Sequence, residues 1–124
     1  MTWQRILASL AGLMGAAGVA LSAVAAHKVQ SPALATAAQM LLIHAVAVLA
    51  LMAMAAGARR PRVWMVAAGV IATGSILFAS ALVAPALAGV TLFAMAAPTG
   101  GSTMIAGWLA VSIAGILELR VAKK

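Results

Sequence analysis

The chain has 124 residues, of which 66% are hydrophobic and only 7% are charged, and its mean hydropathy is +1.18. A soluble domain carries about a quarter charged residues, because solvated groups must cover its core. The composition therefore excludes an ordinary soluble domain and predicts an integral membrane protein. The absence of cysteine excludes a disulfide, a thiolate metal site and a cysteine nucleophile.

The first apolar run extends over Ile6–Ala26. As a helix it would rise about 31 Å, which is enough to cross a hydrocarbon core of about 30 Å. The run also has features of a cleaved signal peptide, since Arg5 precedes it and Ala23–Ala25 is similar to a cleavage site. It is longer than the usual apolar core of a signal peptide, about 7–15 residues, and this favours a membrane span.

The second run begins with a helix start signal, Ser31 followed by Pro32. A serine side chain caps free backbone N–H groups, and proline fits the first helical position. A helix is thus expected from near Pro32, with its most apolar span over Met40–Ala58. The basic segment Arg59–Arg62 closes this span, because Pro61 disfavours helix at the residue before it.

The third apolar run, residues 63–97, is too long for one span. As a single helix it would rise about 52 Å, against a hydrocarbon core of about 30 Å. Pro85 offers a point of division, because proline breaks helices. The division gives a span over Val63–Ala84 and a short piece, Ala86–Ala97, which is expected to be interfacial or re-entrant.

The segment Pro98–Ser102 has the composition of a turn. A short fourth span, Thr103–Leu119, follows it. The chain is therefore predicted to be an all-α integral membrane protein, a bundle of four transmembrane helices that forms a single domain over residues 1–124.

The basic residues predict the orientation. With four spans, both chain ends and the second loop share one side of the membrane, and basic residues accumulate on the cytoplasmic side. Lys28 alone lies on the other side, so both ends are predicted to be cytoplasmic.

Trp3 and Trp64 are expected at the inner interface, as members of an aromatic belt. The positions of the basic residues, between or beyond the apolar runs, argue against nucleic acid as a partner; those on the cytoplasmic side are Arg5, Arg59, Arg60, Arg62, Arg120, Lys123 and Lys124.

Small residues recur at helical spacing in the first and last runs. Helices in lipid associate through close packing of such residues. Two rows are therefore expected to lie inside the bundle or to form a dimer seam. They are Ala8, Gly12, Ala16 and Ala20, with Ala11 and Gly15 beside them, and Ala106, Ala110 and Ala114, flanked by Gly107, Ser112 and Gly115.

Three stretches carry a resemblance to a known family: Ala25–His27, Gln39–Ala45, and Pro98–Gly101 running into Ala106–Trp108. In this order they resemble the small bacterial inner-membrane proteins of the domain of unknown function 423 (DUF423). The resemblance covers essentially the whole chain. It implies four helices and the inner (cytoplasmic) membrane, and it implies no assigned activity.

The two histidines, His27 and His44, are candidate functional residues. Counted from the apolar spans, both are expected in the outer leaflet, where they could approach one another. An ionisable residue within a span is a functional hypothesis by default. For His44 the alternatives are a structural hydrogen bond between helices, a proton- or ligand-linked role, and a metal site. The last is disfavoured because no carboxylate or thiolate lies nearby.

The remaining polar candidates are few. Glu118 is the only acid, lies beside Arg120, and is expected to pair with basic groups at the inner interface. The turn containing Pro98, Gly100 and Gly101 could offer backbone N–H groups to an anion or a lipid head group, or could be a plain loop.

Gln39 and Trp108 complete the set of candidate positions. No Ser–His–acid triad, paired carboxylates or metal cluster can be assembled from the sequence. We therefore expect no catalytic residue, no cofactor and no metal.

Two classes of function remain. The first is a non-enzymatic packing, assembly or modulatory subunit, with the lipid bilayer and other membrane proteins, or a second copy, as partners. The alternative is a homo-oligomeric permease or channel for an ion or small solute that uses His44, Gln39 and the glycine turn. The accessibility of His44 to water distinguishes the two classes.

Overall fold

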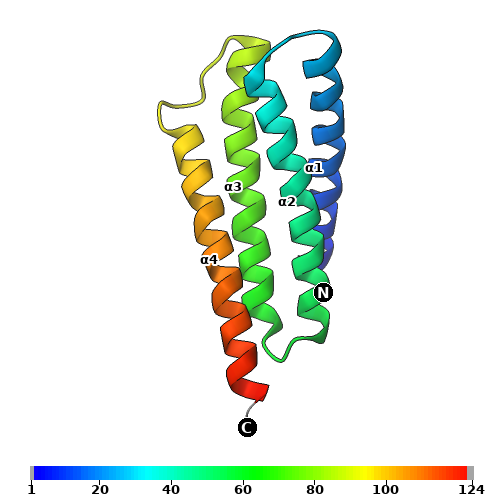
Figure 1. Ribbon diagram of the computed structural model, residues 1–124, viewed down its shortest axis with the longest axis vertical. Coiled ribbons are helices and arrows are strands. Elements are labelled where there is room, and N and C mark those ends of the chain that lie inside the picture. The colour runs from blue at the N-terminus through cyan, green and yellow to red at the C-terminus, as the bar shows by residue number, and fades with distance from the viewer. Residues whose placement is uncertain (1, 123–124) are drawn as a thin grey trace.

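The computed structural model describes residues 2–122, which form four α-helices (Figure 1). They are α1 (Thr2–His27), α2 (Pro32–Gly57), α3 (Pro61–Ala88) and α4 (Ala96–Ala122). All four are long and apolar enough to cross a membrane. Helices of this length rise about 39–42 Å, so each extends beyond a hydrocarbon core of about 30 Å. The prediction of an all-α, four-helix membrane protein is confirmed.

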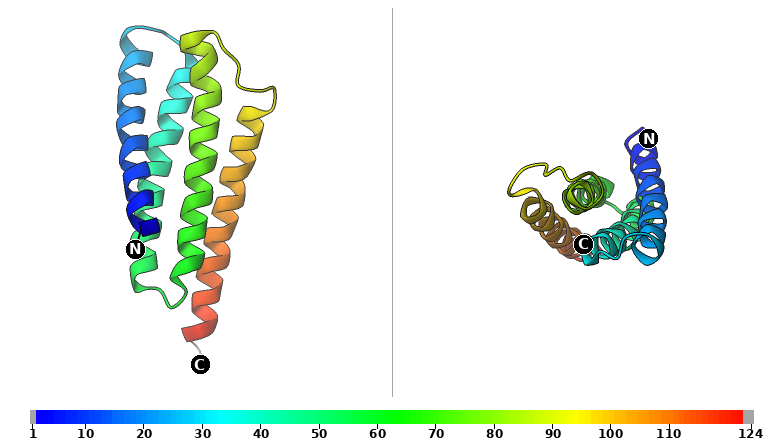
Figure 2. Two further views of the ribbon diagram at one scale, coloured as in Figure 1. Left: turned by 180° about the vertical axis from the view of Figure 1, so that it is seen from behind. Right: turned by 90° about the horizontal axis from the view of Figure 1, so that it is seen from above.

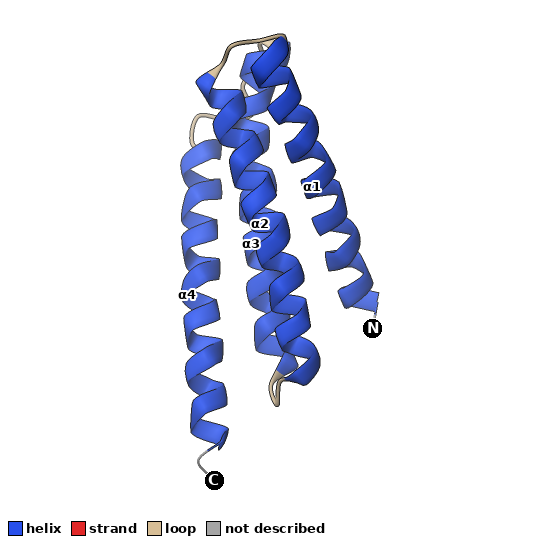
Figure 3. Ribbon diagram, turned by 45° about the vertical axis from the view of Figure 1, so that its right-hand side comes forward, coloured by secondary structure: helices blue, strands red, loops and turns tan. Residues whose placement is uncertain are grey.

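The four helices follow one another as an open, curved row (Figure 2). Each packs along its neighbour in the sequence, whereas α1 and α3 touch only weakly. Among the described residues, no Cα of α4 lies within 8 Å of a Cα of α1 or α2. Figure 3 shows α1 leaning away from α2 toward its N-terminal end. The bundle is therefore open between α1 and α3 and between α1 and α4.

The predicted start of the second helix is confirmed. Ser31 has an extended backbone and caps α2, because its Oγ accepts a hydrogen bond from the backbone N–H of Leu34 at 3.4 Å. Pro32 occupies the first turn. The helix thus begins eight residues before the apolar span at Met40, since capping by Ser31 counts for more here than hydropathy does.

The expected break at Pro85 is wrong. Helix α3 continues through Pro85 to Ala88 and ends at Gly89, whose φ of +65° is left-handed. Glycine adopts this conformation without steric cost, and the N–H groups of Gly89 and Val90 reach the carbonyls of Pro85 and Ala84 at 3.1 and 3.3 Å. Pro85 lies in the last turn of α3, where only one short stretch of helix follows it.

The segment 86–97 is not an interfacial or re-entrant piece. Its first three residues belong to α3, residues 89–95 form the connection to α4, and the last two open α4. The predicted turn Pro98–Ser102 is wrong too, because these residues form the first turns of α4. Pro98 is the third residue of α4, where helical N–H groups have no intrahelical acceptor and proline removes nothing.

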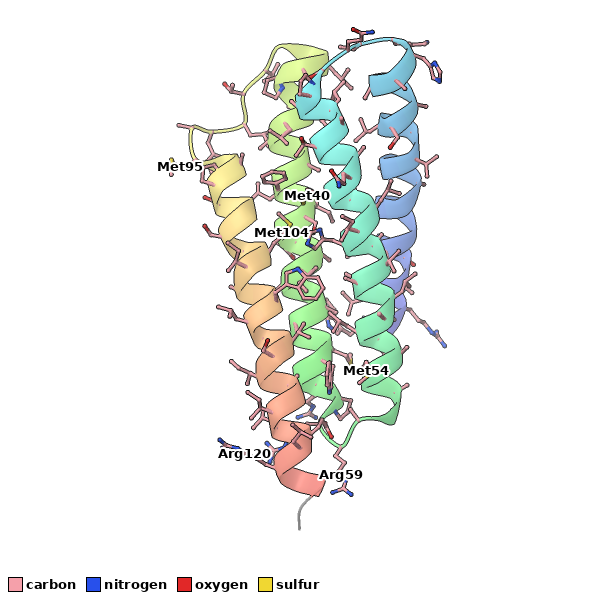
Figure 4. All side chains as sticks on the ribbon, viewed as in Figure 1. Met40, Met54, Arg59, Met95, Met104 and Arg120 are labelled. Atoms are coloured by element: carbon pink, nitrogen blue, oxygen red, sulfur yellow. The ribbon has the colours of Figure 1, made fainter. Side chains whose placement is uncertain are left out.

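The two chain ends and the α2–α3 connection lie at the same end of the molecule (Figure 1). Arg59 of that connection and Arg120 of α4 both lie at this end (Figure 4). The α1–α2 connection, which carries Lys28, lies at the opposite end. The described basic residues other than Lys28 thus lie at one end of the molecule, as the sequence predicts.

Helices α3 and α4 pack most closely, through three glycines. A Cβ on Gly100 would lie 2.5 Å from the backbone N of Phe78, and one on Gly74 would lie 2.8 Å from the backbone N of Met104. A Cβ on Gly107 would lie 2.5 Å from Cγ1 of Ile71. Glycine at these positions is what allows the two backbones to meet.

The small-residue row predicted in the first run faces outward. Ala8, Gly12, Ala16 and Ala20 are all exposed, and a Cβ added to Gly12 would meet nothing within 4 Å. The packed face of α1 is the adjoining one, which carries Leu7, Ala11, Met14 and Gly18. In α4, Gly107 and Ala114 are buried as expected, whereas Ala106 is exposed.

Candidate functional site

His44 lies at the middle of α2. It is the thirteenth residue of this 26-residue helix, about 18 Å from its first residue at about 1.5 Å per residue. The prediction that placed His44 near the outer end is therefore wrong. The cause is the early start of α2 at Pro32, which moves every later residue deeper.

Both ring nitrogens of His44 are hydrogen-bonded. Nδ1 lies 2.7 Å from the carbonyl oxygen of Met40, one turn earlier in α2. The indole Nε1–H of Trp108 donates to Nε2 at 3.2 Å. A carbonyl only accepts and an indole N–H only donates, so the network assigns the proton to Nδ1 and leaves Nε2 as the acceptor of a neutral ring.

The hydrogen bond between His44 and Trp108 spans two helices that are not packed backbone to backbone. Trp108 is the thirteenth residue of α4, so both partners lie at mid-helix. Their rings meet edge to face, with centroids 6.1 Å apart and an interplanar angle of 60°. Figure 4 shows Met40 and Met104, one turn from His44 and from Trp108, far from either end of the molecule.

This arrangement suits a structural role better than a reactive one. His44 is only 6% exposed, and its one unprotonated nitrogen is already occupied by Trp108. A ligand, a metal ion or a second proton at Nε2 would have to displace that hydrogen bond in the middle of the membrane. Of the alternatives considered for His44, the geometry matches the interhelical hydrogen bond.

The other candidate positions are not brought to His44. His27 is exposed at the last residue of α1. Gln39 is exposed and lines a groove between α1 and α2 together with Ser22. The two histidines do not bond to each other, since both nitrogens of His44 bond to other residues.

The glycine segment is a packing element. Gly100 is buried against the backbone of Phe78, and a Cβ added to Gly101 would lie 3.9 Å from Cδ2 of the Phe78 ring. Pro98 is exposed and borders a shallow surface groove with Thr99 and Ser102. The N–H groups of Ala96 and Thr99 already bond the carbonyls of Phe93 and Met95, and Pro98 has no N–H, so the segment does not present the set of free N–H groups that a turn was expected to offer.

Several hydroxyl groups in the helices bond within their own helix. Ser75 is fully buried, and its Oγ donates to the carbonyl of Ile71 at 2.7 Å. Ser22 and Thr73 donate in the same way to the carbonyls four residues earlier, at 2.8 Å each. Such hydroxyls are satisfied by the backbone, and they do not form a polar path through the bundle.

Glu118 lies against basic residues at its end of the bundle, as expected, but the contacts shown are with their backbone. Its two carboxylate oxygens accept hydrogen bonds from the backbone N–H groups of Arg60 at 2.9 Å and Arg59 at 3.2 Å. These groups lie at the start of α3, so Glu118 ties the end of α4 to the α2–α3 connection. The sequence does hold a signal for this contact. Glu118 is the only acid, it lies at the same end of the bundle as the start of α3, and the N-cap residue of α3, Arg60, makes no side-chain capping bond.

The prediction that Trp64 belongs to an aromatic belt at this end is wrong. Only 6% of it is exposed, so it packs inside the bundle and does not belong to a lipid-facing aromatic belt. It lines a pocket with Glu118 and Arg59. Trp3, by contrast, is about half exposed, as a residue at the interface is expected to be.

Residues 9–101 match the family described as protein of unknown function (DUF423). This match covers most of the chain. The chain belongs to the DUF423 family. The matched region includes His27, Gln39, His44 and the glycine segment, and it ends before Trp108 and Glu118. No curated protein and no solved structure matches the chain.

Proposed function

We propose that this DUF423 protein is a non-enzymatic subunit of the bacterial cytoplasmic membrane, with both ends in the cytoplasm, that packs against other membrane proteins and assists or modulates their assembly. The observation that carries this proposal is the hydrogen bonding of His44. Among the described residues, the only titratable side chain near the middle of a helix uses both ring nitrogens to hold α2 to α4.

The open row of helices supports a lateral partner. Because α4 does not close against α1, the helices at both ends of the row keep a face for other molecules. The outward face of α1 carries the exposed small residues Ala8, Gly12, Ala16 and Ala20. Rows of small residues let helices approach closely in lipid.

The alternative hypothesis, a permease or channel, has less support. It would need His44, Gln39 and the glycines to line one water-filled path. In the structure Gln39 faces the groove between α1 and α2, His44 faces α4, and Gly100 is packed on Phe78. These groups lie on different sides of the helices, and this favours the packing role.

The orientation in this proposal rests on charge. The end of the molecule that carries the α2–α3 connection holds Arg59, Arg60 and Arg62, whereas the opposite end holds Lys28. Basic residues mark the cytoplasmic side. A reporter enzyme that is active only outside the cytoplasm should be silent when fused to the C-terminus, and activity of that fusion would reverse the orientation.

Purification after cross-linking in cells tests the packing role. The tagged protein should be recovered in a mild detergent with one or more membrane proteins in fixed ratio, identified by mass spectrometry. Gly12→Leu adds bulk to the outward face of α1 and should reduce that recovery. Ala50→Leu is the control, because it adds bulk at an exposed position of α2, which is not at an end of the row. Recovery of the protein without any partner would contradict the proposal.

A further inference from the structure

The weak contact between α1 and α3 leaves an apolar groove with a volume of about 450 Å³. Its walls include Leu10, Met14 and Leu21 of α1 and Ile76 and Val83 of α3. Leu41 of α2 lies in its floor, so the groove is bounded by three helices. Ser80 is the one residue in its lining with a polar side chain.

The groove lies mostly in the half of the bundle that carries the α1–α2 connection. Along α1 it extends from Leu10 to Leu21, about 17 Å at about 1.5 Å per residue, and its end at Leu10 lies about 7 Å beyond the midpoint of α1. Along α3 its residues all lie between the midpoint of the helix and the end near Ala84. Most of the groove therefore lies in the leaflet that faces the α1–α2 connection.

The other half of the space between α1 and α3 is filled. Leu7 is fully buried. The indole of Trp3 covers Gly69, where a Cβ would lie 3.2 Å from Trp3 Cζ2. An occupant of the groove can thus come from one leaflet only.

Lys28, a basic residue, lies beyond the end of the groove that is nearest the α1–α2 connection. Lys28 follows Leu10 by eighteen residues, which is five turns at about 3.6 residues per turn, so the two lie on the same face of α1. The N–H of Lys28 still bonds the carbonyl of Val24 at 3.0 Å, which continues the helical spacing. Lys28 lies about 20 Å from the midpoint of α1, outside the hydrocarbon and at the depth of lipid phosphates, and it is exposed.

We infer that this groove holds one acyl chain of a phospholipid whose phosphate binds Lys28. An apolar cavity does not retain water, and a chain in the groove contacts three helices where a chain on an outer face contacts one. The ammonium of Lys28 complements the phosphate in charge and lies in register with the groove. This inference goes beyond the proposed packing role, and it depends neither on a protein partner nor on which side of the membrane is cytoplasmic.

Photo-cross-linking tests the inference. The full chain is reconstituted in phosphatidylcholine vesicles that contain phosphatidylglycerol with a diazirine on one acyl chain, and adducts are mapped by peptide mass spectrometry. Adducts should concentrate on the groove residues of α1 and α3. Ala17→Phe, which fills the groove, should reduce them to the level of the exposed face of α4. Ala16→Phe, on the outward face of α1, should leave them unchanged.

The charge at Lys28 gives a second test that does not disturb packing. Lys28→Gln should lower the yield of groove adducts by about fivefold, the change expected for one basic residue at an anionic surface, and Lys28→Arg should preserve the yield. Adducts spread evenly over the exposed faces of all four helices would overturn the inference. So would a yield indifferent to Ala17→Phe and Lys28→Gln, or cross-links that show a second copy or another protein in the groove.

Discussion

The hydrogen bond between Trp108 and His44 is the contact on which the account of the site depends. A buried histidine needs partners for both nitrogens, because an unsatisfied polar group in hydrocarbon is costly. Met40 and Trp108 supply one partner each. The pair holds α4 to α2 at mid-membrane, where no backbone packing joins them.

Trp108→Phe should therefore destabilise the protein while it preserves most of the ring packing. We expect a loss of about 1 kcal/mol in the free energy of unfolding, as for other hydrogen bonds between membrane helices. The measurement is a denaturing-detergent titration of the purified protein in mixed micelles.

A double-mutant cycle with His44→Phe separates the hydrogen bond from the loss of shape. The coupling energy should be between about 0.6 and 1.7 kcal/mol. Trp3→Phe serves as control, since it changes an indole on α1 that packs over Gly69. Additive effects of His44→Phe and Trp108→Phe would show that the two rings do not interact.

At the scale of the helices, close approach of α3 and α4 depends on glycine. Gly100→Ala would place a Cβ 2.5 Å from the backbone N of Phe78 and 2.9 Å from the carbonyl of Gly74. Backbone atoms cannot move aside as a side chain end can. We expect a loss of about 1–3 kcal/mol, the usual cost of overpacking, measured by the same titration.

Gly12→Ala is the control for this prediction, because a Cβ added at Gly12 meets nothing within 4 Å. It should not lower the stability. Equal losses from Gly12→Ala and Gly100→Ala would mean that the cost comes from helix propensity and not from the contact between α3 and α4.

Glu118 provides a second link between helices, at the end of the bundle that carries both chain ends. Glu118→Gln removes the charge and leaves one oxygen acceptor for two N–H groups. Amide hydrogen exchange at Arg59 and Arg60 should become faster, while exchange at mid-helix positions stays the same. Arg120→Gln, which removes a nearby charge without touching an acceptor, should leave both rates unchanged; if it matched Glu118→Gln, the hydrogen bonds would not be the cause.

Hydropathy predicts the number of helices here but not their ends. Each apolar run marks the part of a helix that lies in hydrocarbon, whereas the helices extend further through the polar interface. The position of His44 along its helix differs from the prediction for this reason, because Met40 starts the apolar span but Ser31 caps the helix. Pro98 and Gly100 were assigned to a turn because their composition favours one, and the packing of α4 on Phe78 overrides that preference.

The pairing within the site could not be read from the sequence. His44 and Trp108 are 64 positions apart, and they meet only because α3 lies between α2 and α4 in a curved row. The orientation of α1 was equally hidden, since both of its faces carry small residues at the same spacing. Only the contacts of Gly18 and Gly15 with α2 show which face packs.

At the scale of the whole molecule, the protein is a row of helices in which the buried polar side chains His44 and Ser75 are hydrogen-bonded within the bundle, and we expect its core to be closed to water. A permease of the same length would instead need His44 to face an aqueous path. The chain has no cysteine, so single cysteines report on accessibility without background.

The most direct test is the reaction of a polar thiol reagent with His44→Cys in membrane vesicles. Ser75→Cys gives a second, smaller change at a fully buried position, and Gln30→Cys gives an exposed reference in the α1–α2 connection. We predict rapid labelling at position 30 and labelling at positions 44 and 75 only after denaturation. Labelling of the native protein at position 44 at a rate near that of position 30 would contradict a closed, packed core and would favour a permease.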